Sequence, residues 1–162
     1  MLPIYKKILV TTDLSPNAEH AFKHAITIAK QHNSEIYLLS VIPEVDTSFR
    51  SYVTAVMGTG QLEKLEREHE VAAREEIKQE IDHFAKEELA DQPELLKQFA
   101  GSIVIHGHPV AGILQTADKL DADLIIMGTH GKGDLQYAFL GSVTEKVLRK
   151  SKRPVLAIPL PH

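Results

Sequence analysis

The sequence contains no cysteine, which excludes disulfide bonds, thiolate metal sites and cysteine nucleophiles. We therefore expect a protein of the reducing cytoplasm. The chain also lacks an apolar run that approaches the roughly 20 residues of a membrane span. Its first residues lack the charged, apolar and small-residue regions of a signal peptide. No membrane partner is expected.

The chain is likewise poor in basic blocks, and its formal net charge is -4 over 162 residues. A nucleic-acid surface that relies on phosphate contacts needs clustered Lys and Arg, so we expect a small molecule or a protein as partner instead. The length suits a single domain, residues 1–162, with a full hydrophobic core.

Apolar runs alternate along the chain with segments of helical periodicity. This alternation predicts an α/β fold, an open parallel sheet with right-handed crossovers and helices on both faces. Pro154 and Pro159 bracket the last run and favour an edge position for it. The predicted strands are residues 8–13, 36–42, 102–107, 124–127 and 154–159.

Helix boundaries follow from start signals and apolar stripes. Ser15-Pro16 combines an N-cap hydroxyl with proline at the first helical position, and the helix should stop near residues 32–33. Further helices are predicted from about residue 61 to 90, from Pro109, and over residues 142–150. Residues 44–60 lack periodicity and are interpreted as a long, flexible surface loop.

Residues 125–144 are the most informative stretch, because an apolar strand enters a glycine-rich loop that returns through Gly141-Ser142 into a helix. Glycine permits positive φ and close backbone approach, and the first N–H groups of a helix face an anion. A phosphate site is indicated, with a purely structural turn as the alternative. Gly131-Lys132-Gly133 does not supply the Gly-Lys-Ser/Thr ending of a Walker P-loop.

Asp13 should lie across a crevice from this loop if the first and fourth strands are neighbours. A carboxylate about 4 Å from a phosphate repels it by roughly 4 kcal/mol at an effective dielectric near 20. A helix start returns only about 0.3 to 1 kcal/mol. Asp13 should therefore contact uncharged hydroxyl groups of the ligand or Mg²⁺, which prefers one or two carboxylates plus phosphates. Alternatively, it only caps the next helix.

Histidine and arginine positions give weaker signals. His20 and His24 share one helix face without a third ligand, which favours surface residues over a zinc site. His106 and His108 lie near the sheet edge, either as ligand contacts or as ordinary strand-end residues. No arginine lies in the glycine loop, so any hydrolysis of a bound phosphate ligand should be slow.

The spacing Gly128-x2-Gly131-x9-Gly141-Ser142 resembles the nucleotide-binding signature of the universal stress protein family. The resemblance implies an adenine-nucleotide alpha hydrolase-like fold with strand order 3-2-1-4-5, dimeric through the last strand. Thr11 departs from the pattern, because many ATP-binding relatives carry proline there. The similarity extends to Lys7-Ile8-Leu9-Val10 with Asp13, Ser15-x-x-Ala18, Gly107-x-Pro109, residues 123–131 and Pro154-Val155-Leu156.

The resemblance further implies an adenine-nucleotide ligand, ATP or else ADP or AMP, together with Mg²⁺. His130 is expected to meet the phosphates through its backbone or ring. Asp13 is the one candidate magnesium ligand. The residues implied to bind the nucleotide are Thr12, Asp13, Val41, Met127, Gly128, His130, Gly131, Gly141, Ser142, Val143 and Thr144.

Three functions remain open from the sequence. The preferred one is an ATP-binding regulatory protein of the stress response, a nucleotide-dependent switch or a homodimer that binds an unidentified protein partner, with at most slow hydrolysis. The second is an enzyme that adenylates or transfers a phosphoryl group at the same site. The third is a nucleotide-free dimerisation module in which the glycine loop is a structural turn.

Overall fold

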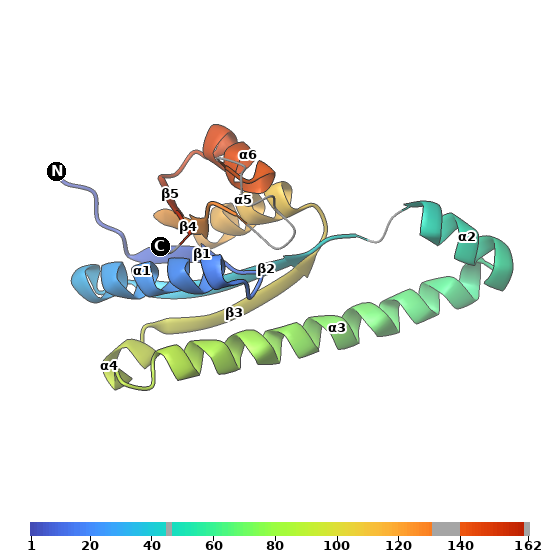
Figure 1. Ribbon diagram of the computed structural model, residues 1–162, viewed down its shortest axis with the longest axis horizontal. Coiled ribbons are helices and arrows are strands. Elements are labelled where there is room, and N and C mark those ends of the chain that lie inside the picture. Colours follow the sequence, from blue (N-terminus) through green and yellow to red (C-terminus); the bar gives the residue numbers. More distant parts are fainter. Residues whose placement is uncertain (45–46, 131–139, 161–162) are drawn as a thin grey trace.

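The computed structural model describes residues 1–44, 47–130 and 140–160. Its core is a five-stranded parallel sheet in the order β3-β2-β1-β4-β5, which confirms the expected topology (Figure 1). β5 lies at an edge, as its flanking prolines predicted. The strands are β1 (Lys7–Thr11), β2 (Glu35–Ile42), β3 (Phe99–His106), β4 (Leu124–Gly128) and β5 (Val155–Ile158).

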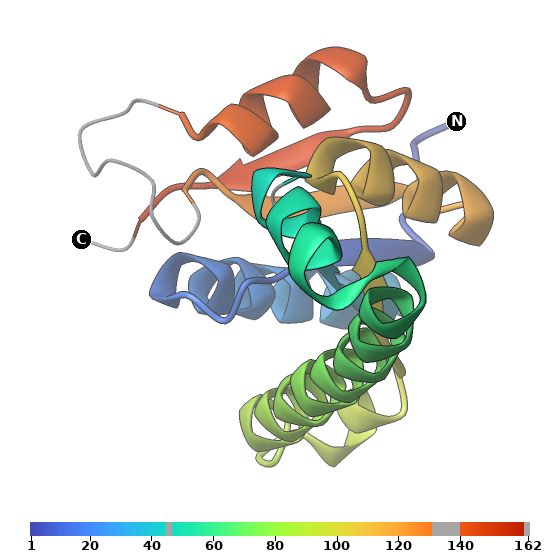
Figure 2. The same ribbon diagram turned by 90° about the vertical axis from the view of Figure 1, so that its right-hand side faces the viewer.

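Helices cover both faces of the sheet (Figure 2). α1 (Pro16–His32) and α3 (Thr59–Glu88) lie on one face, and α5 (Pro109–Leu120) and α6 (Ser142–Lys150) on the other. Side chains of β1 alternate between the two cores: Ile8 packs in the cluster of Phe22, whereas Leu9 packs in the cluster of Ile113. Phe22 is fully buried, and such burial contributes about 1.5 to 3 kcal/mol.

The start of α1 forms as the sequence predicts. The Ser15 hydroxyl accepts the Ala18 N–H at 3.2 Å, and Pro16 is the first helical residue. The helix ends at Asn33, which adopts the left-handed conformation with φ of 53°. α1 therefore begins just beyond the carboxyl end of β1 and brings its first turn to the predicted crevice.

The interpretation of residues 44–60 as a loop was wrong for most of that segment. Thr47–Met57 form helix α2, and α3 begins at Thr59, with Gly58 between them at φ of 82°. The physical reason is a helical repeat of apolar residues, which the surrounding serines and glycines obscured. The repeat consists of Phe49, Tyr52, Val53 and Val56.

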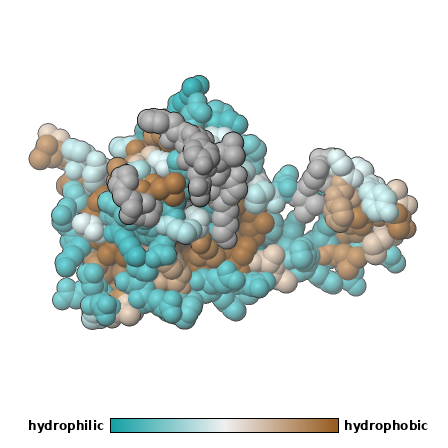
Figure 3. Space-filling model, in the orientation of Figure 1, coloured by the Kyte–Doolittle hydropathy of each residue, from teal (hydrophilic) through white to brown (hydrophobic). Residues whose placement is uncertain are grey.

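α2 and the first half of α3 form an arm that projects beyond the sheet (Figure 1). Hydrophobic side chains gather over α2 at the end of this arm (Figure 3). Phe49, Tyr52 and Val56 are 61%, 69% and 68% exposed. The second half of α3 returns to the core, where Ile81 and Ala85 are fully buried. None of the helices in the described part of the chain has the length and apolar character that a membrane crossing requires.

Candidate functional site

A pocket of about 400 Å³ lies beyond the carboxyl ends of β1 and β4. β1 pairs with β2 on one side and with β4 on the other, so the strand order reverses at this point, where ligands bind in open α/β sheets. The lining residues are Thr11, Thr12, Asp13, Ala18, Leu39, Val41, Pro43, Pro109, Ile113, Met127, Gly128, His130, Val143 and Thr144.

Most of the residues predicted from the sequence come together in this pocket. Gly141 and Ser142 are not among its lining residues, although they form the N-cap and first residue of α6 beside it. Gly131 lies outside the described residues, as does Lys132. The predicted residues that line the pocket are Thr12, Asp13, Val41, Met127, Gly128, His130, Val143 and Thr144.

The turn after β1 places Thr12 and Asp13 at the pocket. The Thr12 hydroxyl oxygen accepts the Leu14 N–H at 3.1 Å, and Asp13 Oδ1 accepts the Ser15 N–H at 2.9 Å. Leu14, between Asp13 and Ser15, has φ of 60°, a conformation that costs an L-residue roughly 1 to 2 kcal/mol. Asp13 therefore supports the entry to α1 and also lines the pocket.

An apolar wall on the β2 side was not predicted, apart from Val41. Leu39 pairs with Thr11, and its carbonyl accepts the Thr12 N–H at 2.8 Å, which brings β2 against the end of β1. Two residues from the first turns of α5 complete the wall. The signal available in the sequence was Pro43, which ends the second strand, and Pro109, which starts the helix after the third strand. The unpredicted apolar residues are Leu39, Pro43, Pro109 and Ile113.

Hydrogen bonds join the two ends of the glycine loop to each other and to the sheet. The buried Thr144 hydroxyl donates to the Gly128 carbonyl at 2.8 Å. The Gly141 N–H donates to the Thr129 carbonyl at 2.7 Å, and the Thr129 N–H donates to the Ile158 carbonyl at 2.9 Å. The start of α6 is thereby held against the end of β4, with its first N–H groups beside the pocket.

Asn17 is a residue of this site that the sequence reasoning missed. It is 2% exposed, in the first turn of α1. Its Oδ1 accepts the His130 N–H at 2.8 Å, and its Nδ2 donates to the Ile158 carbonyl at 3.0 Å. The His130 N–H thus points to Asn17, and its Nδ1 lies 2.8 Å from the Thr129 hydroxyl.

Of the two reasons for glycine given from the sequence, positive φ does not apply to Gly128 or Gly141. Gly141 has φ of -64°, and Gly128 is not among the glycines with φ in the left-handed region. A Cβ on Gly128 would lie 2.7 Å from Asn17 Oδ1 and 2.8 Å from its Cγ, closer than side chains tolerate. At Gly128, close approach of another side chain is therefore the constraint.

Comparison with known proteins assigns the chain to a family. A family model described as the universal stress protein family matches residues 4–159. This chain belongs to that family. Universal stress protein MJ0577 of Methanocaldococcus jannaschii is 37% identical over 162 residues, covering 98% of this chain and 97% of the relative. The solved structure of MJ0577, described as a structure-based assignment of biochemical function, superposes with a TM-score of 0.76 at 35% identity, covering 98% and 99% of the two chains.

Two further solved structures share the fold at lower identity. One is a universal stress protein in complex with cAMP, with a TM-score of 0.58 at 22% identity over 98% of this chain and 99% of that one. The other is the universal stress protein from Archaeoglobus fulgidus in complex with dAMP, with a TM-score of 0.50 at 20% identity over 96% and 98%.

The charges around the pocket are unusual for a phosphate site. Asp13 is the one charged side chain among the described lining residues, and no lysine or arginine accompanies it there. Arg149 pairs with Glu145 at 2.8 Å. Arg153 pairs with Asp118 at the far end of α5. Both arginines therefore form ion pairs with residues that do not line the pocket.

The histidine pairs show no metal centre in the parts of the chain that the structure describes. The His20 and His24 rings pack edge to face with centroids 4.8 Å apart, as neighbours on the surface of α1. His106 Nδ1 lies 3.5 Å from Arg74 Nη2 of α3, and His108 is the N-cap residue of α5. Neither His106 nor His108 lines the crevice pocket.

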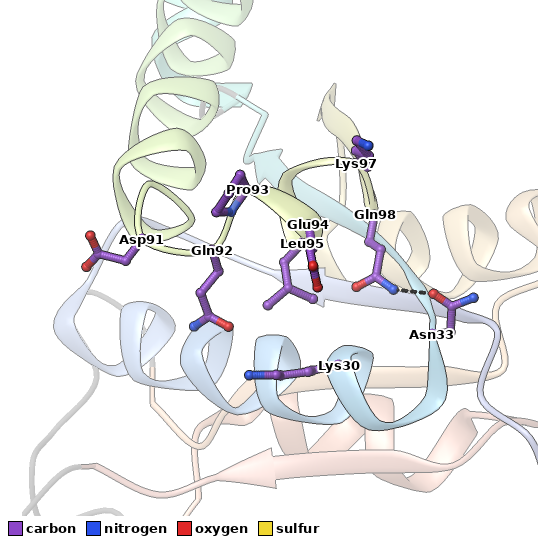
Figure 4. A pocket seen from close by; sticks show the side chains of 9 residues that line it. All are labelled: Lys30, Asn33, Asp91, Gln92, Pro93, Glu94, Leu95, Lys97 and Gln98. Carbon is purple, nitrogen blue, oxygen red and sulfur yellow. Dashed lines mark hydrogen bonds between the residues drawn. The ribbon is translucent and has the colours of Figure 1, made fainter.

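A larger hollow, about 550 Å³, lies around α4 (Pro93–Leu96), near the amino ends of β2 and β3 (Figure 4). Gln98 and Asn33 face each other there, with a hydrogen bond of 2.6 Å. This hollow has neither a glycine loop nor the carboxyl end of a strand, and α4 is only one turn long. The smaller crevice pocket is therefore the candidate nucleotide site despite its size.

Proposed function

We propose that this protein binds ATP in the crevice pocket and acts in the cytoplasm as a regulatory protein of the stress response. The observation that carries the proposal is that one pocket combines an apolar wall with polar strand ends and a helix start. The apolar wall suits an adenine ring, and the polar strand ends and the helix start suit phosphates. The cAMP and dAMP complexes of two proteins with this fold support an adenine nucleotide as ligand.

In this proposal the adenine lies against Leu39 and Val41, where the Val41 backbone can accept or donate a hydrogen bond. The ribose lies near Thr12, whose hydroxyl still has a hydrogen to donate. The phosphates extend toward the first N–H groups of α6, which an anion stabilises. The fastened contact between Gly128 and Thr144 supports this path, because it keeps the helix start at the pocket.

The pocket offers Mg²⁺ one protein ligand among the described residues, the Asp13 carboxylate. Asp13 is the only carboxylate among the described lining residues, so the ion would take one protein ligand and otherwise phosphate oxygens and water, as Mg²⁺ commonly does. When bound, the ion would offset the repulsion between Asp13 and the phosphates. Asp13 would hold its position through the Ser15 N–H.

The nucleotide can be identified directly from the protein. Purified protein is denatured, and the released small molecules are analysed by chromatography and mass spectrometry; calorimetry then measures Mg-ATP, Mg-AMP, cAMP and a nonhydrolysable ATP analogue. Bound or tightly binding ATP supports the proposal. Rapid turnover to a product would favour an adenylating or phosphoryl-transferring enzyme, and an empty site without affinity would favour a nucleotide-free dimerisation module.

The magnesium role is tested by Asp13→Asn, which keeps an oxygen for the Ser15 N–H but removes the charge. We expect Mg²⁺ to strengthen ATP binding to the unmodified protein and to have little effect on the variant. In EDTA the variant should bind ATP more tightly than the unmodified protein. Its side chain lacks the carboxylate charge, which at about 4 Å repels a phosphate charge by roughly 1 to 4 kcal/mol. Affinity of the unmodified protein that is independent of Mg²⁺ would contradict the bridging role.

A further inference from the structure

The backbone from Gly128 to His130 is held by partners from three directions. Thr144 of α6 donates to the Gly128 carbonyl, Ile158 of β5 accepts the Thr129 N–H, and Asn17 of α1 accepts the His130 N–H. Only the last of these is a side chain that also bonds a second element, because Asn17 donates to Ile158 as well. Asn17 thus joins α1, β4 and β5 at the root of the glycine loop.

We propose that Asn17 is a positioning residue, which holds the backbone from Gly128 to His130 in place for the phosphates of an adenine nucleotide. We further propose that position 128 is glycine because a larger residue would collide with the Asn17 side chain. The inference rests on the proposed function for its first half. Its second half concerns packing and stands on the described contacts alone.

The chemistry of the contacts selects asparagine. One end of the side chain must accept from an N–H and the other must donate to a carbonyl, at 2.8 and 3.0 Å, in a place that is nearly inaccessible to water. A primary amide has both an acceptor and a donor. Aspartate is the same shape but, when ionised, only accepts, and its second oxygen would face the Ile158 carbonyl. Leucine has a similar volume and offers neither group.

Close packing at Gly128 gives the second line of argument. A Cβ there would lie 2.7 Å from Asn17 Oδ1 and 3.1 Å from Nδ2, so it would meet both ends of the amide. The amide can move away only by breaking its hydrogen bonds to His130 and Ile158. The Gly128 backbone does not itself need the left-handed region. The pair is therefore coupled: one residue is glycine because the other is a buried asparagine.

The packing half is tested by a double-mutant cycle on thermal stability with Gly128→Ala, Asn17→Ala and the combined variant. We expect Gly128→Ala alone to lower the melting temperature, and the same substitution to have little or no effect when Asn17 is already alanine. Additive effects of the two substitutions would overturn this half, as would a Gly128→Ala variant of unchanged stability. This measurement needs no nucleotide, so it remains decisive even if the protein fails to bind ATP.

The positioning half is tested by Mg-ATP affinity from pH 5 to 8, with each variant compared with the unmodified protein at the same pH. Asn17→Leu should bind roughly tenfold or more weakly at every pH, the equivalent of one lost hydrogen bond to a buried group. Asn17→Asp should be equally weak at pH 8 and recover as the carboxyl gains a proton, because a protonated carboxyl can again donate to Ile158.

Ser15→Ala is the matched control, because Ser15 caps the same helix turn and is comparably buried but does not contact His130. It should lower stability while its affinity stays within about twofold. Asn17 variants that bind as tightly as the unmodified protein would overturn the positioning role. So would an Asn17→Asp variant whose loss is the same at all pH values, since a purely structural defect would not track the carboxyl proton. If the unmodified protein itself does not bind, the proposed function fails instead.

Discussion

At the scale of single residues, Ser142 is a position where helix stability and phosphate binding should respond in opposite directions to a negative charge. It is the first residue of α6 and is exposed. A carboxylate here interacts favourably with the helix dipole by about 0.3 to 1 kcal/mol. The same carboxylate would repel a bound phosphate by roughly 1 to 4 kcal/mol at about 4 Å.

We therefore predict that Ser142→Glu weakens Mg-ATP binding roughly tenfold or more while the melting temperature stays constant or rises. Ser142→Gln is the matched control, because it has the same shape without the charge and should retain most of the affinity. Calorimetry and thermal denaturation measure the two properties. Equal affinities of the Glu and Gln variants would place the phosphates away from this helix start.

The residues at the strand ends were predictable, whereas Asn17 was not. Thr12, Asp13 and Met127 end apolar runs, and the carboxyl ends of parallel strands share one edge of the sheet. Asn17 follows Pro16 in a helix start, where a polar residue is ordinarily exposed. Nothing local in the sequence indicates that its amide turns inward, because its partners His130 and Ile158 are 113 and 141 residues away.

At the scale of elements, the contact between α5 and the sheet controls the apolar wall of the pocket. A Cβ on Gly112 of α5 would lie 2.9 Å from Ile105 Cδ1 and 3.2 Å from Val41 Cγ2. Val41 lines the pocket and, being β-branched, has little rotamer freedom. The helix can therefore lie close to β2 and β3 only because position 112 carries no side chain.

We predict that Gly112→Ala weakens Mg-ATP binding by displacing Val41, with overpacking of about 1 to 3 kcal/mol partly offset by better helix propensity. Ile105→Val removes the methyl group that the new Cβ would meet. It should cost about 0.5 to 1.5 kcal/mol in the unmodified protein but stabilise the Gly112→Ala variant. Denaturant unfolding measures the effect of Ile105→Val on stability in the unmodified protein and in the Gly112→Ala variant, and calorimetry measures the affinity for Mg-ATP. Destabilisation by Ile105→Val in both proteins would contradict this account.

The same scale explains which elements the sequence predicted. α1, the long α3 and the strands of the sheet follow from periodicity and start signals, because burial of one face demands that pattern. α2 escaped prediction because its apolar repeat stands among serines, threonines and glycines; in the structure Phe49 and Tyr52 of this repeat are mostly exposed. The pattern was present, but the usual reason for it, a core to pack against, was not.

At the scale of the whole molecule, β5 offers an edge for association. The carbonyls of Pro154 and Ile158 accept hydrogen bonds from Ile125 of β4 and from Thr129 just after it, so by alternation the N–H groups of Val155 and Ala157 face away from the sheet. Leu156 is 36% exposed beside them. Within the described residues no strand lies beyond β5, so this edge can pair with a second copy, as a homodimer through the last strand, which the family resemblance implies, would require.

We predict that the protein is a dimer paired through β5 and that the Ala157→Pro variant is a monomer, because the substitution removes an outward N–H without touching the bonds to β4. Light scattering coupled to gel filtration measures the mass, and circular dichroism checks that the fold is retained. Ala157→Val, which keeps the N–H, is the control and should remain dimeric. A Pro variant that stays dimeric would place the interface elsewhere.

The length of α3 has a consequence for how the molecule opens. Its 30 residues span about 45 Å as one helix. Ile81 and Ala85 are fully buried near its end, whereas Leu65 and Val71 are 47% and 64% exposed and Leu62 is the one buried side chain of the outer half. Fraying of the outer half therefore loses little burial beyond that of Leu62 and stops at Ile81, since local stability follows packing. A continuous helix thus contains a boundary between two regimes of local unfolding, and we expect changes in the length of its outer half to leave the crevice pocket intact, because no described residue of α2 or α3 lines that pocket.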